Sequence, residues 1–312
     1  MIKISVTIPA YNGEKYIRAA MDSLIGQSLQ EWECIVFDNA SSDNSKSIIK
    51  EYAEKDKRFR LIESKENLGA SAGRNAGIDA AKGEYVTFLD QDDLFDPRAF
   101  ESLYAAAKLY DADMVFGNMT VVEDDFKISK KRAKGSGKVI VMDNPQKKFH
   151  GQIPGWCYVW NKIFRREKLG AMRFYEELYP CEDTHLVLRF APACNRIVHV
   201  DAATIFWRKS TSSFTHNEGK LNPRYIRSMA TMLLLMDKAI SENPDWEKSY
   251  KKFVREAIEK PLVIKLLRHG DRSETVRLKD YRMRSLSPRK KLAWRLFKTG
   301  LADRLALVLY KL

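Results

Sequence analysis

Strand and helix patterns alternate over the first hundred residues, and this alternation constrains the fold more than any other feature of the chain. Short apolar runs rich in β-branched residues predict strands at 4–8, 34–37, 60–63 and 85–89. Helical spacing predicts helices at 14–28, from the Ser41-Ser42-Asp43 cap to about residue 54, and at 71–81. Such alternation is typical of βαβ units, so we expect an α/β fold with a mostly parallel sheet and helices on both faces.

Polar residues follow three of these predicted strands. The first strand runs into Pro9-Ala10-Tyr11-Asn12, the second into Asp38-Asn39, and the fourth into Asp90-Gln91-Asp92-Asp93. Ligands of open α/β sheets bind outside the carboxyl ends of the strands. Each segment alone could be a turn, but the three together predict one ligand site.

The segment Asp90-Gln91-Asp92-Asp93 places three carboxylates within four residues. Carboxylates this close repel one another and are costly to desolvate unless a cation neutralises them. Mg²⁺ and Mn²⁺ prefer oxygen ligands, and Mg²⁺ often takes one or two carboxylates together with substrate phosphates. The segment therefore predicts a metal that holds a diphosphate. The alternative is that Asp92 or Asp93 caps a helix that begins at Pro97.

Four motifs of the first hundred residues carry a resemblance to a known family. They are Val6–Asn12, Ile35–Asp43, Glu66–Gly77 and Phe88–Asp93. In order and spacing they resemble the motifs of the family 2 glycosyltransferases, and a weaker resemblance continues through Glu182-Asp183 to about residue 216. The resemblance implies the GT-A fold, which is Rossmann-like, and an enzyme that transfers a sugar with inversion.

The resemblance also implies a site for a uridine nucleotide and a divalent metal. Asp38 would accept the imide N–H of uracil, although it could instead cap a turn. Asn39 and Ala40 stand where the family usually has an acidic residue and a glycine, which weakens the choice of nucleotide. The expected nucleotide-binding residues are Pro9, Tyr11, Glu14, Asp38, Arg74 and Asp90, and the expected ligands of Mn²⁺ or Mg²⁺ are Asp92 and Asp93.

An inverting transfer also needs a base that takes the proton of the acceptor hydroxyl. The resemblance assigns this role to Asp183, with Glu182 as the second candidate. The alternative is that the pair caps the apolar helix predicted to follow.

Candidates for acceptor binding are Trp156, Lys162 and His216. Trp156 also alternates with Tyr158 and Trp160, a spacing that predicts one face of a core strand. Lys162 could equally lie in a solvated basic turn, and His216 lies in a segment that resembles the closing loop of the family.

The net charge of +13 lies entirely in the C-terminal part of the chain. Residues 1–219 hold 31 basic and 31 acidic side chains, and residues 220–312 hold 23 basic and 10 acidic ones. We expect a catalytic domain at 1–219, with a nucleotide half at about 1–100 and an acceptor half at about 101–219. A basic helical region is expected at 220–312.

The basic region predicts a partner as well as helices. Met229, Met232, Leu233 and Met236 lie at helical spacing, and basic amphipathic segments with interfacial aromatic residues follow after residue 288. Such segments favour adsorption to an anionic membrane surface. The alternative is that they pack on the catalytic domain or on another subunit.

Cysteine usage and hydropathy bear on the compartment. The four cysteines form no CxxC pair, which favours a reducing compartment and argues against a zinc site or a disulfide framework. No apolar run reaches the roughly 18–20 residues that span a bilayer, and no signal-peptide pattern opens the chain. We therefore expect a cytoplasmic protein, peripheral at the inner face of the membrane.

The expected function is a metal-dependent glycosyltransferase that uses a UDP-sugar and extends a glycan or lipid-linked glycan in cell-surface polysaccharide synthesis, for example of lipopolysaccharide. A sugar-phosphate nucleotidyltransferase is an alternative, but no glycine-rich phosphate loop accompanies it. A basic nucleic-acid-binding protein is another, but no such motif is present, so we expect no nucleic-acid partner. The oligomeric state stays open.

Overall fold

The computed structural model describes residues 1–123, 137–145, 157–178, 181–208 and 223–242, and the single residues 262, 278, 292, 294 and 295. The chain divides into two compact units. The first contains residues 1–145, 152–176 and 182–213, and the second contains residues 146–151, 177–181 and 214–312. Every strand described below lies in the first unit.

The described strands form one nine-stranded sheet. They are β1 (Ile4–Ala10), β2 (Trp32–Asp38), β3 (Phe59–Glu63), β4 (Tyr85–Phe88), β5 (Leu94–Phe95), β6 (Met114–Val122), β7 (Val139–Asp143), β8 (Lys162–Arg165) and β9 (Arg196–Arg208). Strands β3, β2, β1 and β4 are neighbours in that order and parallel, as the sequence predicts. The rest of the sheet is mixed, since β8 is antiparallel to β4 and β6, and β9 is parallel to β6 but antiparallel to β5 and β7.

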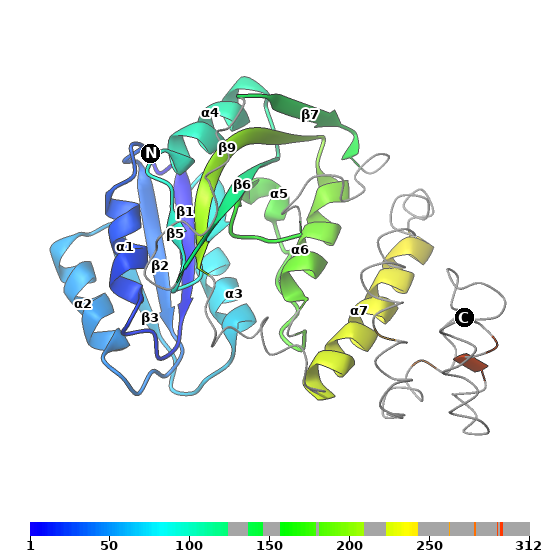
Figure 1. The fold of residues 1–312 in the computed structure, drawn as a ribbon, viewed down its shortest axis with the longest axis horizontal. Helices are drawn as coiled ribbons and strands as arrows, with labels where there is room; N and C mark the ends of the chain where they lie inside the picture. Colours follow the sequence, from blue (N-terminus) through cyan, green and yellow to red (C-terminus); the bar gives the residue numbers. More distant parts are fainter. Residues whose placement is uncertain are drawn as a thin grey trace. The chain divides into compact units, whose positions relative to one another are not determined.

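Helices cover both faces of the sheet (Figure 1). They are α1 (Ile17–Ile25), α2 (Ser45–Lys55), α3 (Ala70–Ala80), α4 (Ala99–Leu109), α5 (Arg166–Leu169) and α6 (Glu182–Phe190), followed by a 3₁₀ turn at Ala191–Ala193. Side chains of β1 alternate between the faces, because successive residues of a strand point to opposite sides. Ile4, Val6 and Ile8 are buried in a core with residues of α1, α2 and α4, whereas Thr7 lies against α3.

Two glycines let α3 lie directly on the opposite face. A Cβ atom at Gly77 would clash with the side chain of Thr7 on β1. A Cβ atom at Gly73 would lie 3.0 Å from the ring of Phe37 and 3.1 Å from Pro9. The close approach fixes α3 beside the carboxyl ends of β1 and β2, and Arg74 is the next residue of this helix.

One expectation and one alternative about local structure are wrong. Tyr158 and Trp160 lie in a turn before β8 and not on a strand; their rings stack with centroids 4.7 Å apart. Neither Asp92 nor Asp93 caps the next helix, which begins at Ala99 and not at Pro97. A tight turn intervenes instead, in which the backbone N–H of Arg98 donates to a carboxylate oxygen of Asp96.

The second unit contains α7 (Pro223–Glu242). Met229, Met232, Leu233 and Met236 are buried along one side of this helix, in agreement with their helical spacing. The predicted amphipathic segments after residue 288 lie almost wholly outside the described residues. Within the part of the chain that is described, no helix has both the length and the apolarity needed to cross a membrane.

Candidate functional site

The three polar strand ends meet at one edge of the sheet, as the sequence predicts. Strands β2, β1 and β4 are adjacent and parallel, so their carboxyl ends lie side by side. The backbone N–H of Tyr11 donates to the side chain of Gln91 at 2.9 Å, and Gln91 donates back to the carbonyl of Tyr11 at 3.0 Å. The N–H of Asn39 donates to the carbonyl of Ala10 at 2.8 Å. These hydrogen bonds tie the three loops into one site.

Asp38 is a buried carboxylate at the last position of β2, with only 1% of its surface exposed. Its Oδ2 accepts one long hydrogen bond, 3.4 Å, from the N–H of Ser41. Its Oδ1 is buried and has no hydrogen-bond partner among the described residues. Because a buried acceptor without a donor is costly, this oxygen suits a donor group of a bound ligand.

The residues expected around the nucleotide base take different positions. Tyr11 is 45% exposed, so its ring is available to a ligand, and Pro9 is half-buried against α3. Glu14 accepts hydrogen bonds of 3.0 Å from the backbone and side chain of Asn44 at the start of α2, so it already holds two loops together. Ala40 has a φ of 61°, a region that favours glycine, which is consistent with the glycine usual at this position in the family.

The carboxylates after β4 face an arginine that the sequence analysis did not single out. Arg208, the last residue of β9, donates from Nη2 to Asp92 Oδ2 at 2.7 Å and from Nε to the Asp92 carbonyl at 3.0 Å. Its backbone N–H donates to Asp93 Oδ1 at 2.9 Å. Its guanidinium carbon lies 3.6 Å from the ring centre of Tyr16. The weaker family resemblance, which extends to about residue 216, was the only sequence signal for this residue.

Burial and charge make the acidic segment favourable for a cation. Burial, with repulsion from Asp90, raises the pKa of Asp92 although Arg208 opposes the rise. Burial, with repulsion from Asp92, raises the pKa of Asp93 well above its usual range. Asp93 is 2% exposed and faces β9, whereas the side chain of Asp92 is 35% exposed. Asp92 is therefore better placed than Asp93 to reach a metal ion.

No group of three or more histidine, cysteine or acidic side chains with the geometry of a metal site occurs within the described ranges. The oxygen donors present still fit a hard divalent ion, because Mg²⁺ often takes only one or two carboxylates and completes its shell with water and phosphate oxygens. The repulsion among Asp90, Asp92 and Asp93, which raises the pKa of Asp92 and of Asp93, favours such an ion.

Arg74 does not lie on the surface but in a buried cluster of carboxylates. Its exposed fraction is 4%. Nη2 donates to Asp90 Oδ1 at 2.7 Å, and Nη1 donates to Glu182 Oε1 at 3.0 Å and lies 3.2 Å from Asp183 Oδ1. Burial alone would lower the pKa of Arg74, but the three carboxylates outweigh it and raise the pKa. The guanidinium is thus occupied by protein carboxylates and is not exposed to a nucleotide.

Asp183 is a carboxyl group with a pKa suited to a base. It lies in the first turn of α6, where its Oδ2 accepts a long 3.4 Å hydrogen bond from the N–H of Val159. Burial raises its pKa to about 7, with repulsion from Glu182 and Asp90 adding to the rise and Arg74 opposing it. A base works best when its pKa lies near the operating pH. Glu182 is 7% exposed and bound to Arg74, so Asp183 is the better placed of the two.

Of the three expected acceptor residues, the structure describes only Lys162. Lys162 is fully buried, and its Nζ donates to the carbonyl of Tyr158 and to Asn161 Oδ1, so the alternative of a solvated turn is wrong. Burial lowers the pKa of Lys162 to about 7. Trp156 and His216 lie outside the described residues.

A family model and several known proteins match this chain. The model described as "Glycosyl transferase family 2" matches residues 5–178. The putative glycosyltransferase EpsH of Bacillus subtilis is 34% identical over 175 residues, which cover 54% of this chain and 49% of that protein. A GalNAc(5)-diNAcBac-PP-undecaprenol beta-1,3-glucosyltransferase of Campylobacter jejuni is 32% identical over 185 residues, which cover 59% of this chain and 58% of that protein. The chain thus spans about half the length of these curated relatives.

A solved structure with the same fold is that of S. aureus TarS, residues 1–349, in complex with UDP-GlcNAc. It matches with a TM-score of 0.68 at 19% identity, and the match covers 99% of this chain and 91% of that chain. At this identity the likeness concerns the fold alone. It confirms the predicted α/β architecture of the GT-A type.

Proposed function

The chain belongs to the family 2 glycosyltransferases, and from this membership we propose that it transfers a sugar from a UDP-sugar to a hydroxyl group of a bacterial cell-surface glycan. The observation that carries the proposal is that the strand ends at Asp38 and before Asp92 lie side by side. Arg74 links this edge to Asp183, because it binds Asp90 and lies 3.2 Å from Asp183 Oδ1. Each of the three carboxylates has the burial and surroundings that its proposed role requires.

The choice of UDP rests on Asp38. Its buried Oδ1, which lacks a donor among the described residues, would accept the imide N–H of uracil, and Tyr11 would lie against the base. TarS, which shares the fold, has been crystallised in complex with UDP-GlcNAc and in complex with UDP. A uridine nucleotide is therefore the first donor to test.

Asp92 would hold a divalent ion, Mn²⁺ or Mg²⁺, that neutralises the charge developing on the departing diphosphate. Asp90, which accepts a hydrogen bond from Arg74, would contact the ribose. Arg208 keeps the Asp92 side chain oriented from the other side. Asp93 would support the segment from its buried position against β9.

Asp183 would act as the base. Its carboxylate would accept the proton of the acceptor hydroxyl as the hydroxyl oxygen bonds to the anomeric carbon, and the nucleoside diphosphate would leave from the opposite face. The result is inversion of configuration, with one proton on Asp183 that returns to solvent before the next turnover. The transition state would have the oxocarbenium character known from glycoside hydrolysis.

The proposed acceptor rests on the basic charge of the C-terminal region and on the name of one relative. The name of the Campylobacter jejuni protein describes a polyprenyl diphosphate-linked glycan acceptor. The excess of basic residues at 220–312 would favour an anionic membrane, where such an acceptor resides. We therefore propose a peripheral enzyme at the inner face of the membrane, which extends a lipid-linked glycan.

The first test is nucleotide binding followed by thermal denaturation. UDP with Mn²⁺, at a hundredfold excess over Kd, should stabilise the protein by about 2.7 kcal/mol, and GDP and CDP should not. Asp38→Asn should lose most of this effect, while Asp143→Asn, an exposed position on β7, should keep it. Equal stabilisation by all three nucleotides would contradict the role of Asp38. A transfer assay completes the test, because Asp92→Ala and Asp183→Asn should each lose activity.

A further inference from the structure

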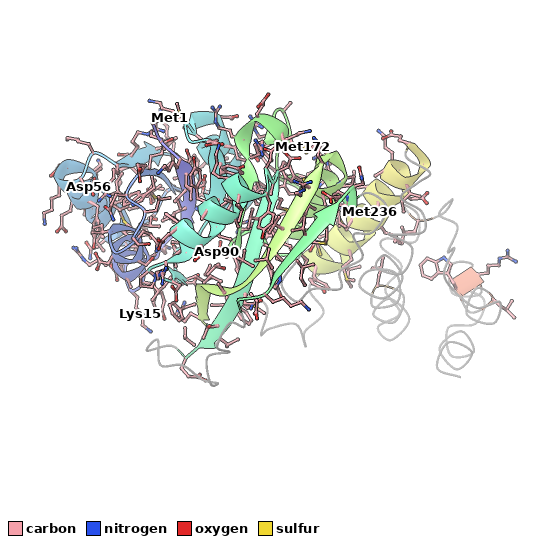
Figure 2. All side chains as sticks on the ribbon, turned by 90° about the horizontal axis from the view of Figure 1, so that it is seen from above. Met1, Lys15, Asp56, Asp90, Met172 and Met236 are labelled. Carbon is pink, nitrogen blue, oxygen red and sulfur yellow. The ribbon has the colours of Figure 1, made fainter. Side chains whose placement is uncertain are left out.

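Arg74 joins residues that the chain keeps far apart. Asp90 is 16 positions and Glu182 is 108 positions away in sequence, yet both bind the same guanidinium. Asp90, which is labelled in Figure 2, lies two residues after the end of β4, and Glu182 opens α6. The guanidinium therefore links the proposed nucleotide side of the site to the proposed base.

The two sides are held by different nitrogens of one rigid group. Nη2 binds Asp90, whereas Nη1 binds Glu182 and lies 3.2 Å from Asp183. A guanidinium is planar, so its two ends move together. A movement of the guanidinium toward or away from Asp90 therefore also changes the distance between Nη1 and Asp183.

The charges in this cluster do not balance. Three carboxylates face one buried cation, and the exposed fractions of their side chains are 34% for Asp90, 9% for Glu182 and 17% for Asp183. Asp90 is the most exposed of the three, so it is the one that a ligand reaches first. Its charge acts on Asp183 as repulsion, whereas Arg74 acts as attraction.

We propose that Arg74 is a positioning residue that couples nucleotide binding at Asp90 to ionisation of the base Asp183. A ribose hydroxyl that donates to Asp90 weakens the bond between Asp90 and Arg74. The positive charge of Arg74 then stabilises the ionised form of Asp183 more strongly, and Asp183 loses its proton to solvent. Bound donor would thereby prepare the base. This coupling rests on the proposed function.

Several titratable groups among the described residues act on Asp183. Glu182 precedes it on α6, Arg74 faces it from α3, and Lys162 and Cys157 act on it from β8 and from the turn before β8. None of these others bonds to Asp90 in the described structure, so Arg74 is the direct link between the two sides.

The experiment measures protons released when UDP binds. Calorimetric titration with UDP and Mn²⁺, at pH 7 in buffers of different ionisation enthalpy, gives the number of protons released per bound UDP. The same titration on Asp183→Asn gives the number of protons that UDP binding releases from groups other than Asp183. If binding lowers the pKa of Asp183 by about one, the wild type should release about 0.4 proton more than this variant.

Three variants separate the possible causes. Arg74→Lys keeps a charge but cannot bridge both sides, so the extra release should fall below about 0.1 proton. Asp90→Asn should do the same and serves if Arg74→Lys fails to fold. Arg18→Lys is the matched control, because Arg18 is an exposed arginine paired with Glu51 on the surface.

Each possible result either supports or overturns the coupling through Arg74. We expect the wild type to release more protons than Asp183→Asn. This difference should disappear in Arg74→Lys and remain in Arg18→Lys. Equal release by wild type and Asp183→Asn, or proton uptake by the wild type, overturns the coupling while UDP binding leaves the proposed function intact. Retained release in Arg74→Lys overturns the role of Arg74. If the wild type binds no UDP, the proposed function fails first, and the coupling with it.

Discussion

Replacement of Asp183 by asparagine should stabilise the folded protein although it removes the proposed base. The folded environment raises the pKa of Asp183 from 3.8 to about 7, chiefly through burial. A carboxyl group with a raised pKa contributes its stability fully below pH 3.8 and loses it as the pH rises through about 7. The asparagine side chain has no charge to lose, so the variant should gain on the wild type over this range.

The size of the gain follows from the same numbers. A difference between 3.8 and about 7 corresponds to at most about 4 kcal/mol. The amide must also be desolvated, and its NH₂ group meets Arg74, so a net gain of about 1–2 kcal/mol is expected. For a protein of this size that is a rise in Tm of roughly 2–8 °C.

Thermal denaturation at pH 5 and pH 8 tests this reasoning. The gap between Asp183→Asn and wild type should be smaller at pH 5, where the folded wild type still holds Asp183 largely neutral, and largest at pH 8. Asp143→Asn, which breaks an exposed ion pair with Arg196, should change stability by less than about 0.5 kcal/mol at either pH. A variant that is less stable than wild type at pH 8, or an equal gap at both values, would refute the argument.

Three further outcomes are expected. If Asp183 is the base, kcat/KM for transfer should rise roughly tenfold from pH 6 to pH 8, because the carboxyl group with a pKa of about 7 must lose its proton to act; a flat profile would remove it from that role. Arg208→Gln should lower the free energy of unfolding by about 2 kcal/mol, measured in urea, because Asp92 loses a buried charged partner; a loss under about 0.5 kcal/mol would show that the pair is weak. Gly77→Ala should cost about 1–3 kcal/mol through its clash with β1, whereas Gly26→Ala, where the nearest atom to the new Cβ lies 3.5 Å away, should be nearly neutral.

The sequence predicted the parts of the site that depend on local order. Asp38 and Asp92 follow apolar strands, and parallel strands bring their carboxyl ends together whatever the side chains are. The first four strands and their helices were found for the same reason, since their patterns repeat at short range. The second half of the sheet gave no comparable signal, because β8 and β9 pair across long separations and with mixed direction.

Partners of individual side chains could not be read from the sequence. Arg74 was expected to bind the nucleotide, but its partners lie up to 109 positions away and depend on where α6 packs. No role was predicted for Arg208. Lys162 was expected in a solvated turn or at the acceptor, because basic residues are seldom fully buried. Its burial depends on Tyr158 and Asn161, which accept its hydrogen bonds.

The interleaved sheet limits how this enzyme could be recombined with its relatives. Strand β5, which belongs to the nucleotide half by sequence, pairs with β9 at Phe206 and Ile205, and β4 pairs with β8 at Arg165. In a chimera joined near residue 100, β4 and β5 would come from one parent and would have to pair with β8 and β9 of the other parent. A junction after Arg208 would keep every described strand of the sheet, and the hydrogen bond between Arg208 and Asp92, within one parent. Donor and acceptor preference would then be exchanged more safely by replacing loops than by exchanging halves.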